Sequence, residues 1–192
     1  LPDPCCPPLQ QPTMTQLEVP SEYGYVMLVA VISAIQIMIF AVFAGSQRKH
    51  FKTESFKKSP EWTALKEQHK KSFPSFSFTS YPDMGNGRIS AGLTYEQWYE
   101  FNCYQRVHYN YVEGITTFMV LLFIGGLYWP VGAAAMGGVY IMGRFFYAAG
   151  YGLGGSRHHV RVAGAGLIDV ALLALAAASL LFSLRFAGVL SS

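Results

Sequence analysis

Residues 100–114 read EFNCYQRVHYNYVEG and run directly into the apolar stretch ITTFMVLLFIGG at 115–126. At about 100° per residue, Asn102, Arg106, Asn110 and Glu113 fall within about 80° of arc on one helix face. Ionisable side chains on a helix that enters a membrane are costly unless they pair with each other or hold a ligand. The stretch therefore predicts either a ligand site or an Arg/Glu network that ties helices together.

Apolar runs dominate the rest of the chain. Four of them are long enough, or nearly so, to cross roughly 30 Å of hydrocarbon. These runs are 23–45, 112–127, 131–151 and 162–186. The second is short, but the polar-faced helix before it extends it. The sequence predicts an all-α integral membrane protein, a four-transmembrane-helix bundle built by one domain.

The basic residues are unevenly distributed. No Lys or Arg precedes Arg48, nine lie from Arg48 to Arg88, and Arg157 and Arg161 separate the last two apolar runs. By the positive-inside rule, the loops that hold these residues face the cytosol. The membrane surface thus explains the net charge of +3, and nucleic acid binding is not indicated.

Composition divides the chain into three segments. The Pro-rich segment 1–20 is predicted to be extended or disordered. The membrane domain covers 21–186, and 187–192 is a short tail.

A long cytosolic loop, residues 52–93, separates the first two apolar runs and is called the insert below. Within it, 60–71 is predicted to form a short amphipathic surface helix with Trp62 and Leu65 on one side. The turn-rich remainder, with its aromatic residues, is predicted to lie as a cap over the cytosolic face. A Thr-x-x-Gln capping box at 94–97 is predicted to start the helix that follows the insert.

Further polar residues lie in the predicted spans. Tyr140, Arg144, Tyr147 and Tyr151 fall within about 60° of arc on the third span, at the same membrane end as Arg106. A face that carries an Arg together with tyrosines indicates a ligand site more strongly than interfacial tyrosines alone do.

Two isolated polar residues lie within the other spans. Gln36 in the first span is predicted to make a helix–helix hydrogen bond. Asp169 in the fourth span is predicted to pair with Arg144 or Arg106.

Metal and disulfide chemistry are not indicated. His158 and His159 project in different directions on a helix and have no carboxylate nearby in sequence, so no metal site is predicted. Three cysteines, Cys5, Cys6 and Cys103, make no disulfide framework.

Several short motifs occur in a fixed order along the chain. They are EYG at 22–24, RK at 48–49, YP at 81–82, FNCxQRxHxNxxE at 101–113, GRxxYxxGY at 143–151 and Arg161. This order and spacing resemble the membrane-associated eicosanoid and glutathione metabolism (MAPEG) superfamily. Within it, the chain is most similar to the microsomal glutathione transferases of type 3.

The resemblance implies a homotrimer that binds glutathione between subunits near the cytosolic face. The glutathione-binding residues that it implies are Arg48, Arg106, His108, Asn110, Glu113, Arg144, Tyr147 and Tyr151. Arg161 aligns with the arginine that stabilises the glutathione thiolate. Lys49 aligns with a basic residue proposed to act on the second substrate.

The function implied is that of a membrane-bound glutathione transferase or peroxidase. It would conjugate lipophilic electrophiles or reduce lipid hydroperoxides, in the endoplasmic reticulum or an organelle membrane such as the mitochondrial one. The insert is much longer than the loop of the family and could occlude the cleft. The alternative is therefore a weakly active or non-catalytic accessory subunit of a larger membrane protein complex.

Overall fold

The computed structural model describes residues 19–78, 83–152 and 157–190. The predictions for Cys5, Cys6 and the YP motif at 81–82 lie outside these residues. The described chain is helical, with two short 3₁₀ helices, η1 and η2. In order, the elements are α1 (Tyr23–Ser46), η1 (Gln47–Lys52), α2 (Glu54–Lys57), α3 (Pro60–Ser72), η2 (Ser90–Gly92), α4 (Tyr95–Tyr128), α5 (Pro130–Tyr151) and α6 (His158–Phe186).

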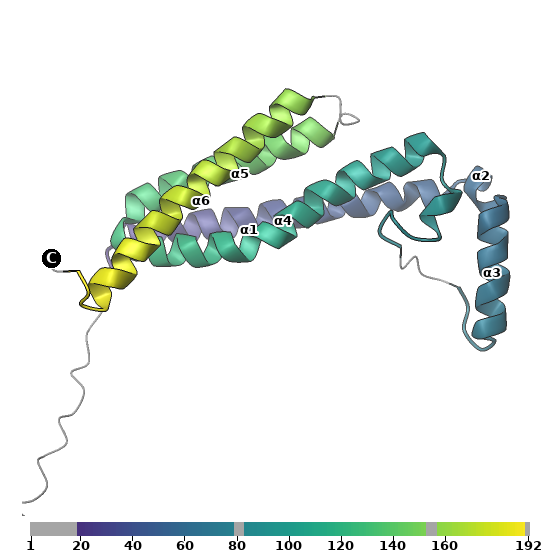
Figure 1. Cartoon of the computed structure of the whole chain (residues 1–192), viewed down its shortest axis with the longest axis horizontal. Helices are drawn as coiled ribbons and strands as arrows, with labels where there is room; N and C mark the ends of the chain where they lie inside the picture. Colours follow the sequence, from purple (N-terminus) through teal and green to yellow (C-terminus); the bar gives the residue numbers. More distant parts are fainter. Residues whose placement is uncertain (1–18, 79–82, 153–156, 191–192) are drawn as a thin grey trace, which may run out of the picture.

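The four long helices α1, α4, α5 and α6 lie side by side as a bundle (Figure 1). Within the described residues, three segments are long and apolar enough to cross a membrane: Tyr23–Lys52, α4 and α6. Helix α5, with 22 residues, is not among these three, and glycines, tyrosines and Arg144 interrupt its apolar residues.

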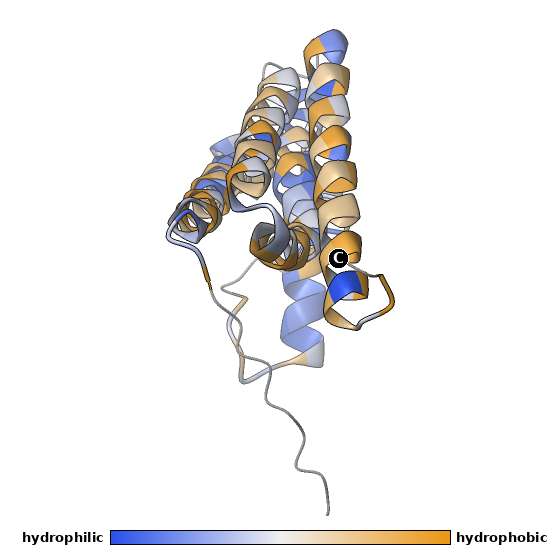
Figure 2. Cartoon of the chain, turned by 90° about the vertical axis from the view of Figure 1, so that its left-hand side faces the viewer, coloured by the Kyte–Doolittle hydropathy of each residue, from blue (hydrophilic) through white to orange (hydrophobic). Residues whose placement is uncertain are grey.

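The outer surface of the bundle is apolar. Met38, Val42 and Leu173 are 68%, 71% and 71% exposed, respectively. Figure 2 shows the long helices largely in the hydrophobic colours and α3 in blue. Apolar side chains on the outside of long helices are suited to lipid or to another subunit. The prediction of an all-helical membrane protein is confirmed at this level.

Helix α4 begins at the predicted capping box. The Thr94 hydroxyl accepts from the Gln97 backbone N–H at 3.4 Å, and the Thr94 N–H donates to Gln97 Oε1 at 3.3 Å. These bonds satisfy two backbone positions that a helix start leaves open. The helix then continues for 34 residues, so one continuous element carries the polar stretch 100–114 into the bundle.

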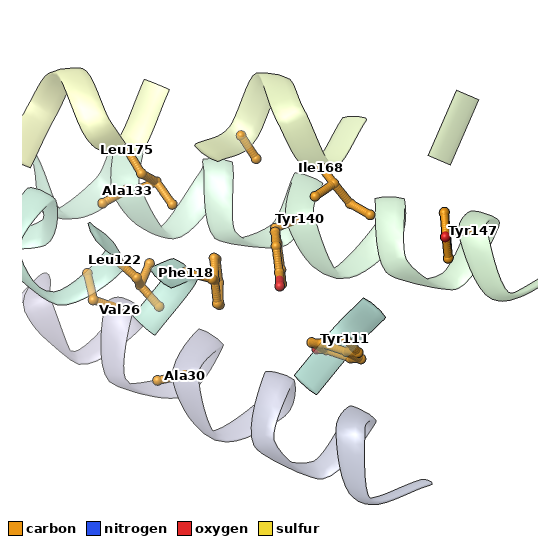
Figure 3. Close-up of a cluster of buried hydrophobic side chains, with 11 residues drawn as sticks. Val26, Ala30, Tyr111, Phe118, Leu122, Ala133, Tyr140, Tyr147, Ile168 and Leu175 are labelled. Atoms are coloured by element: carbon orange, nitrogen blue, oxygen red, sulfur yellow. The ribbon is translucent and has the colours of Figure 1, made fainter. Parts of the chain in front are cut away.

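Aromatic and aliphatic side chains from all four long helices fill the core of the bundle. Figure 3 shows this cluster, with Tyr111, Phe118 and Tyr140 at its centre. The rings of Phe118 and Tyr140 stack with centroids 3.7 Å apart. Helices α5 and α6 approach closely because Gly143 and Gly164 face each other, and a Cβ on Gly143 would lie 2.9 Å from the Gly164 carbonyl oxygen.

Gln36 makes the predicted helix–helix hydrogen bonds. Its Oε1 accepts from the Tyr111 hydroxyl at 2.9 Å, and its Nε2 donates to the Ile141 carbonyl at 3.1 Å. One side chain of α1 thus binds both α4 and α5, and this prediction is confirmed.

The prediction for Asp169 is wrong. Its side chain is exposed on α6 and forms no ion pair with Arg144 or Arg106 among the described residues. Its neighbour Ile168 faces the core, and one residue further on the helix turns Asp169 outward by about 100°. Arg144 is instead bound by neutral partners on α4 and α5.

A second apolar cluster joins the insert to η1 and α4. It consists of Phe51, Phe56, Trp62, Ile89 and Phe101, with Leu65, Phe78 and Leu93 packed against it. Helix α3 confirms the predicted helix and lies across the direction of the bundle (Figure 1). Its Trp62 and Leu65 pack into this cluster, so the apolar side of α3 is covered by the insert itself.

Candidate functional site

The polar face of α4 divides into inward and outward residues. Asn102 donates to the carbonyls of Gly85 and Trp98, each at 2.9 Å. Asn110 is half-buried, whereas Arg106 and Glu113 are exposed and form no ion pair with another described residue. The two charged side chains of this face are therefore the ones left at the surface of the single chain.

Arg144 is buried between α4 and α5, with 3% of the residue exposed. Its Nη1 donates to Asn110 Oδ1 at 2.6 Å, and its Nη2 donates to the Tyr140 hydroxyl at 2.8 Å. The guanidinium also lies over the rings of Tyr111 and Tyr140, 4.7 and 4.9 Å from their centroids. Gly114 leaves the room for it, since a Cβ there would collide with Arg144. The geometry shows Arg144 orienting Asn110.

Tyr147, Tyr151 and Arg161 form a second group at the end of α5 and the start of α6. Arg161 Nη1 donates to the Tyr151 hydroxyl at 3.3 Å, and its guanidinium lies 5.2 Å from the centre of the Tyr151 ring. The rings of Tyr147 and Tyr151 are 5.3 Å apart. Arg106 and Arg161 both lie within electrostatic range of the Tyr147 hydroxyl. The structure thus brings the polar faces of α4 and α5 to one end of the bundle, with Arg161 beside them.

Arg48 and Lys49 lie on η1 at this same end. Arg48 Nη2 is 3.8 Å from the Met84 sulfur in the insert. Lys49 Nζ is 3.4 Å from Glu100 Oε1 near the start of α4. Both basic residues therefore lie against elements that frame the predicted site.

His108 is half-buried on α4. Its ring lies 6.3 Å from that of Tyr109, and its Nδ1 is buried without a hydrogen-bond partner among the described residues. The glutathione-binding role of His108 stays a prediction.

A hollow of about 330 Å³ lies beside Arg106. It is lined by Met84, Asn86, Asn102, Gln105, Arg106 and Tyr109. Met84, Asn86, Gln105 and Tyr109 were not predicted as site residues. The turn-rich segment around Met84 and Asn86 carries no motif for ligand binding, and Gln105 and Tyr109 on α4 are not among the positions that the family resemblance implies. One side of this hollow belongs to the insert.

A second, apolar hollow of about 220 Å³ lies between α1, α4 and α5. Its lining is Phe40, Phe43, Tyr104, Val107, Phe145, Ala148, Ala149 and Gly152. The Tyr104 hydroxyl donates to the Gly152 carbonyl at 3.5 Å, so this hollow lies next to the end of α5 that carries Tyr151. A third cavity, about 360 Å³, lies within the insert, and none of the predicted site residues lines it.

Among the described residues, no three His, Cys, Asp or Glu side chains come together as a metal site would require. The hydrogen-bonding groups at this end of the bundle are instead guanidinium, amide, phenol and carboxylate. Such groups are suited to a charged organic ligand.

A family model described as "MAPEG family" matches residues 26–181 of the chain. The match includes α4, α5, most of α1 and α6, and all residues of the two polar groups.

Proposed function

This chain belongs to the MAPEG family, and from that premise we propose that it is a membrane-bound glutathione transferase or peroxidase. Its second substrate would be a lipophilic electrophile or a lipid hydroperoxide. The likeness to the type 3 microsomal enzymes, noted from the motifs above, supports the proposal. The single observation that carries it is that Tyr151 contacts both Tyr147 and Arg161 at one end of the bundle, with Arg106 within electrostatic range of Tyr147.

The charges at this end are complementary to glutathione, which has two carboxylates and an ammonium group at neutral pH. Arg106 and Arg48 would bind the carboxylates, because a guanidinium can donate two parallel hydrogen bonds to one carboxylate. Glu113 would take the ammonium group. Asn110, oriented by Arg144, would bind the peptide, with His108 and Tyr147 completing the site.

The proposed chemistry depends on the glutathione thiolate. A free thiol has a pKa of about 8.5, so only a few per cent is ionised at pH 7. The guanidinium of Arg161 would favour the anion, and its hydrogen bond to Tyr151 would hold it in place. Lowering the thiol pKa by two units corresponds to about 2.7 kcal/mol, which is a reasonable demand on one partly desolvated arginine.

The thiolate would then react with the second substrate in one of two ways. With an electrophile, sulfur forms a bond to carbon while a leaving group departs with its electron pair. Where the electrophile has an activated double bond, the electron pair of that bond moves onto the activating group, and the adduct then takes a proton from water. With a hydroperoxide, sulfur attacks the terminal oxygen, the O–O bond breaks, and the lipid alkoxide takes a proton from water and leaves as the alcohol. The thiol of a second glutathione then attacks the resulting sulfenic acid, which gives the disulfide and water. Lys49 would act on this second substrate. The apolar hollow next to Gly152 suits the hydrocarbon part of such a substrate.

We further propose that four helices cross the membrane and that three copies of the chain assemble. Helix α5 is long enough for a crossing, at about 33 Å. Arg106 and Glu113 are exposed on the single chain, so a second copy would close the site around them. Glutathione would enter from the cytosolic side, at the endoplasmic reticulum or mitochondrial membrane.

The proposal is tested by glutathione binding and thiolate absorbance on the purified protein. We expect the wild type to generate a thiolate signal near neutral pH and Arg161→Ala to lose most of it. Arg157→Ala is the matched control, because Arg157 is exposed and lies only four residues before Arg161. A wild type that binds no glutathione, or that forms no thiolate, would refute the catalytic proposal.

A second candidate is an accessory subunit of a larger membrane complex. The folded insert favours it, since Phe76 of the insert is 71% exposed and could meet a partner. Native gels of mild detergent extracts separate the two candidates. Co-migration with a large complex supports the accessory role, and a lone trimer supports the enzyme.

A further inference from the structure

We infer that the insert forms one wall of the glutathione pocket and that the Asn86 amide binds the same ligand carboxylate as Arg106. This inference rests on the proposed function. It assigns a binding role to a segment that the sequence interpretation treated as a cap or an obstruction.

The loop that carries Asn86 is held in shape by one buried carboxylate. Asp83, 6% exposed, accepts from the backbone N–H groups of Gly85, Gly87 and Ser90 at 2.8, 2.9 and 2.7 Å. The Ser90 hydroxyl also donates to it, at 3.2 Å. Four hydrogen bonds to one charged group fix the path of the chain from 83 to 90.

The same loop is docked on the first turns of α4. The Gly85 carbonyl accepts from Trp98 Nε1 at 2.8 Å and from Asn102 Nδ2 at 2.9 Å. Gly85 has φ +105°, and a Cβ there would lie 2.8 Å from the Asn102 side chain and 2.9 Å from that of Phe101. Only glycine allows this backbone conformation together with this approach.

Docking at Asn102 sets the position of the residues beside Gly85. Arg106 lies one helical turn after Asn102, and Met84 and Asn86 line the same hollow of about 330 Å³ as Arg106. Met84 also contacts Arg48, at 3.8 Å. The loop therefore lies against both arginines to which carboxylate binding is assigned.

Asn86 is the residue of this loop that is available to a ligand. Its side chain is exposed and makes no hydrogen bond to another described residue. An amide can donate to a carboxylate and accept from a peptide N–H, and glutathione offers both groups. A hollow remains between the insert and Arg106, so the docked loop lines this pocket without filling it.

The first test measures glutathione affinity by calorimetry, together with KM and kcat, on the full-length protein. Asn86→Ala should raise Kd and KM about five- to tenfold, as expected for one hydrogen bond to a partly solvated charge. The melting temperature and kcat should stay near those of the wild type, because the side chain makes no internal bond. Gln68→Ala is the control, since it removes an amide from the same insert but lies away from Arg106.

The outcomes separate the two proposals. If the wild type binds glutathione and Asn86→Ala binds equally well, the inference is overturned and the proposed function stands. If the wild type binds no glutathione, both fail. Gly85→Ala gives a second variant, which should weaken binding at least as much because it displaces the loop from Asn102.

Two analogues of glutathione, each with one carboxylate converted to an amide, identify the group that is bound. The losses caused by Asn86→Ala and by Arg106→Ala should both disappear with the same analogue. Losses that disappear with different analogues would show that the two side chains bind different groups and would overturn the inference.

Discussion

Arg144 is a cation with nearly all of its surface removed from water. Such a charge is costly unless it is paired or hydrogen-bonded. Asn110 and Tyr140 accept from two of its nitrogens, while its Nε is buried without a partner among the described residues. The bonds run from α5 to α4 and within α5. The residue thus stabilises the helix pair and presents Asn110, which is a positioning role.

Replacing this arginine should destabilise the bundle. Arg144→Leu leaves the Asn110 amide and the Tyr140 hydroxyl without this partner, at about 1–3 kcal/mol for each buried group. We expect a clear fall in the melting temperature in detergent, and only partial recovery in Arg144→Lys, since lysine lacks the planar fork. Arg185→Leu, at the exposed end of α6, is the control and should melt near the wild-type temperature. An Arg144→Leu protein of wild-type stability would contradict this role.

Asp83 makes the insert sensitive to acid. Burial alone would raise its pKa, but the hydrogen bonds from Ser90, Gly85 and Gly87 outweigh burial and hold the pKa below the ordinary value. A carboxyl with a lowered folded-state pKa stabilises the fold fully above its unfolded pKa, about 3.9. That stabilisation is lost as the pH falls through the lowered folded value.

We therefore expect the loop 83–90 to loosen as the pH falls below about 4. Hydrogen exchange of the Gly85, Gly87 and Ser90 amides, scaled to unfolded-peptide rates at each pH, measures this change. In Asp83→Asn the loop should be loose already at neutral pH, and its protection should vary little with pH. Protection in the wild type that stays constant from pH 6 to pH 3 would contradict the prediction.

At the scale of elements, the contact of α5 with α6 positions Arg161 beside Tyr151. Three glycines make the contact possible, since a Cβ on Gly143, Gly150 or Gly164 would collide with the facing helix. Small residues allow such close packing of membrane helices, where van der Waals contact is a main driving force. The geometry of the proposed thiolate site thus depends on residues that would not touch a ligand.

Gly164→Ala should force the two helices apart, because its Cβ would meet the backbone of Tyr147 and Gly143. We expect a loss of about 1–3 kcal/mol, as for other overpacked sites, and a weaker glutathione thiolate signal. Gly166→Ala is the matched control, since a Cβ there meets nothing within 4 Å. It should be neutral or slightly stabilising, because alanine favours helix over glycine. Equal melting temperatures for the two variants would contradict the close-packing account.

At the scale of the whole molecule, the described residues build two apolar clusters, one in the bundle and one, the insert cluster, that joins the insert to η1 and α4. Helix α4 passes from one cluster to the other, with Phe101 in the insert cluster and Tyr111 in the bundle core. The insert cluster thus holds the insert against the start of α4, where the hollow beside Arg106 lies.

Trp62→Ala should loosen the insert and leave the bundle folded. Truncating a buried tryptophan costs about 3–5 kcal/mol, and Trp62 packs against Phe56 and Phe78. Hydrogen exchange should increase in α3 and in the loop 83–90 but not in α5 and α6. Phe76→Ala, an exposed aromatic in the same insert, should change neither region. Loss of protection across all the long helices would show that the two clusters unfold together.

Local patterns in the sequence predicted the helical architecture. The long apolar runs and the Thr94–Gln97 capping box depend only on residues close in sequence. The prediction for Gln36 depends on a single polar group within an apolar helix. A polar side chain in an apolar helix must find a partner, so the hydrogen bonds of Gln36 could be expected without knowing the packing.

The tertiary structure decided which polar residues remain available and what lies against them. Periodicity places Asn102, Arg106, Asn110 and Glu113 on one face. Only the packing of α5 and of the insert determines that the two asparagines are hydrogen-bonded within the chain, to Arg144 and to Gly85. It likewise turned Asp169 outward, because the rotation of α6 about its own axis is set by the close approach of Gly143 and Gly164. The position of Asn86 beside Arg106 requires the turn around Asp83 and the docking of Gly85 on Asn102. These contacts join residues up to 17 positions apart. The sequence by itself determined the helices and their polar faces, and the packing between them determined which of those faces a ligand can reach.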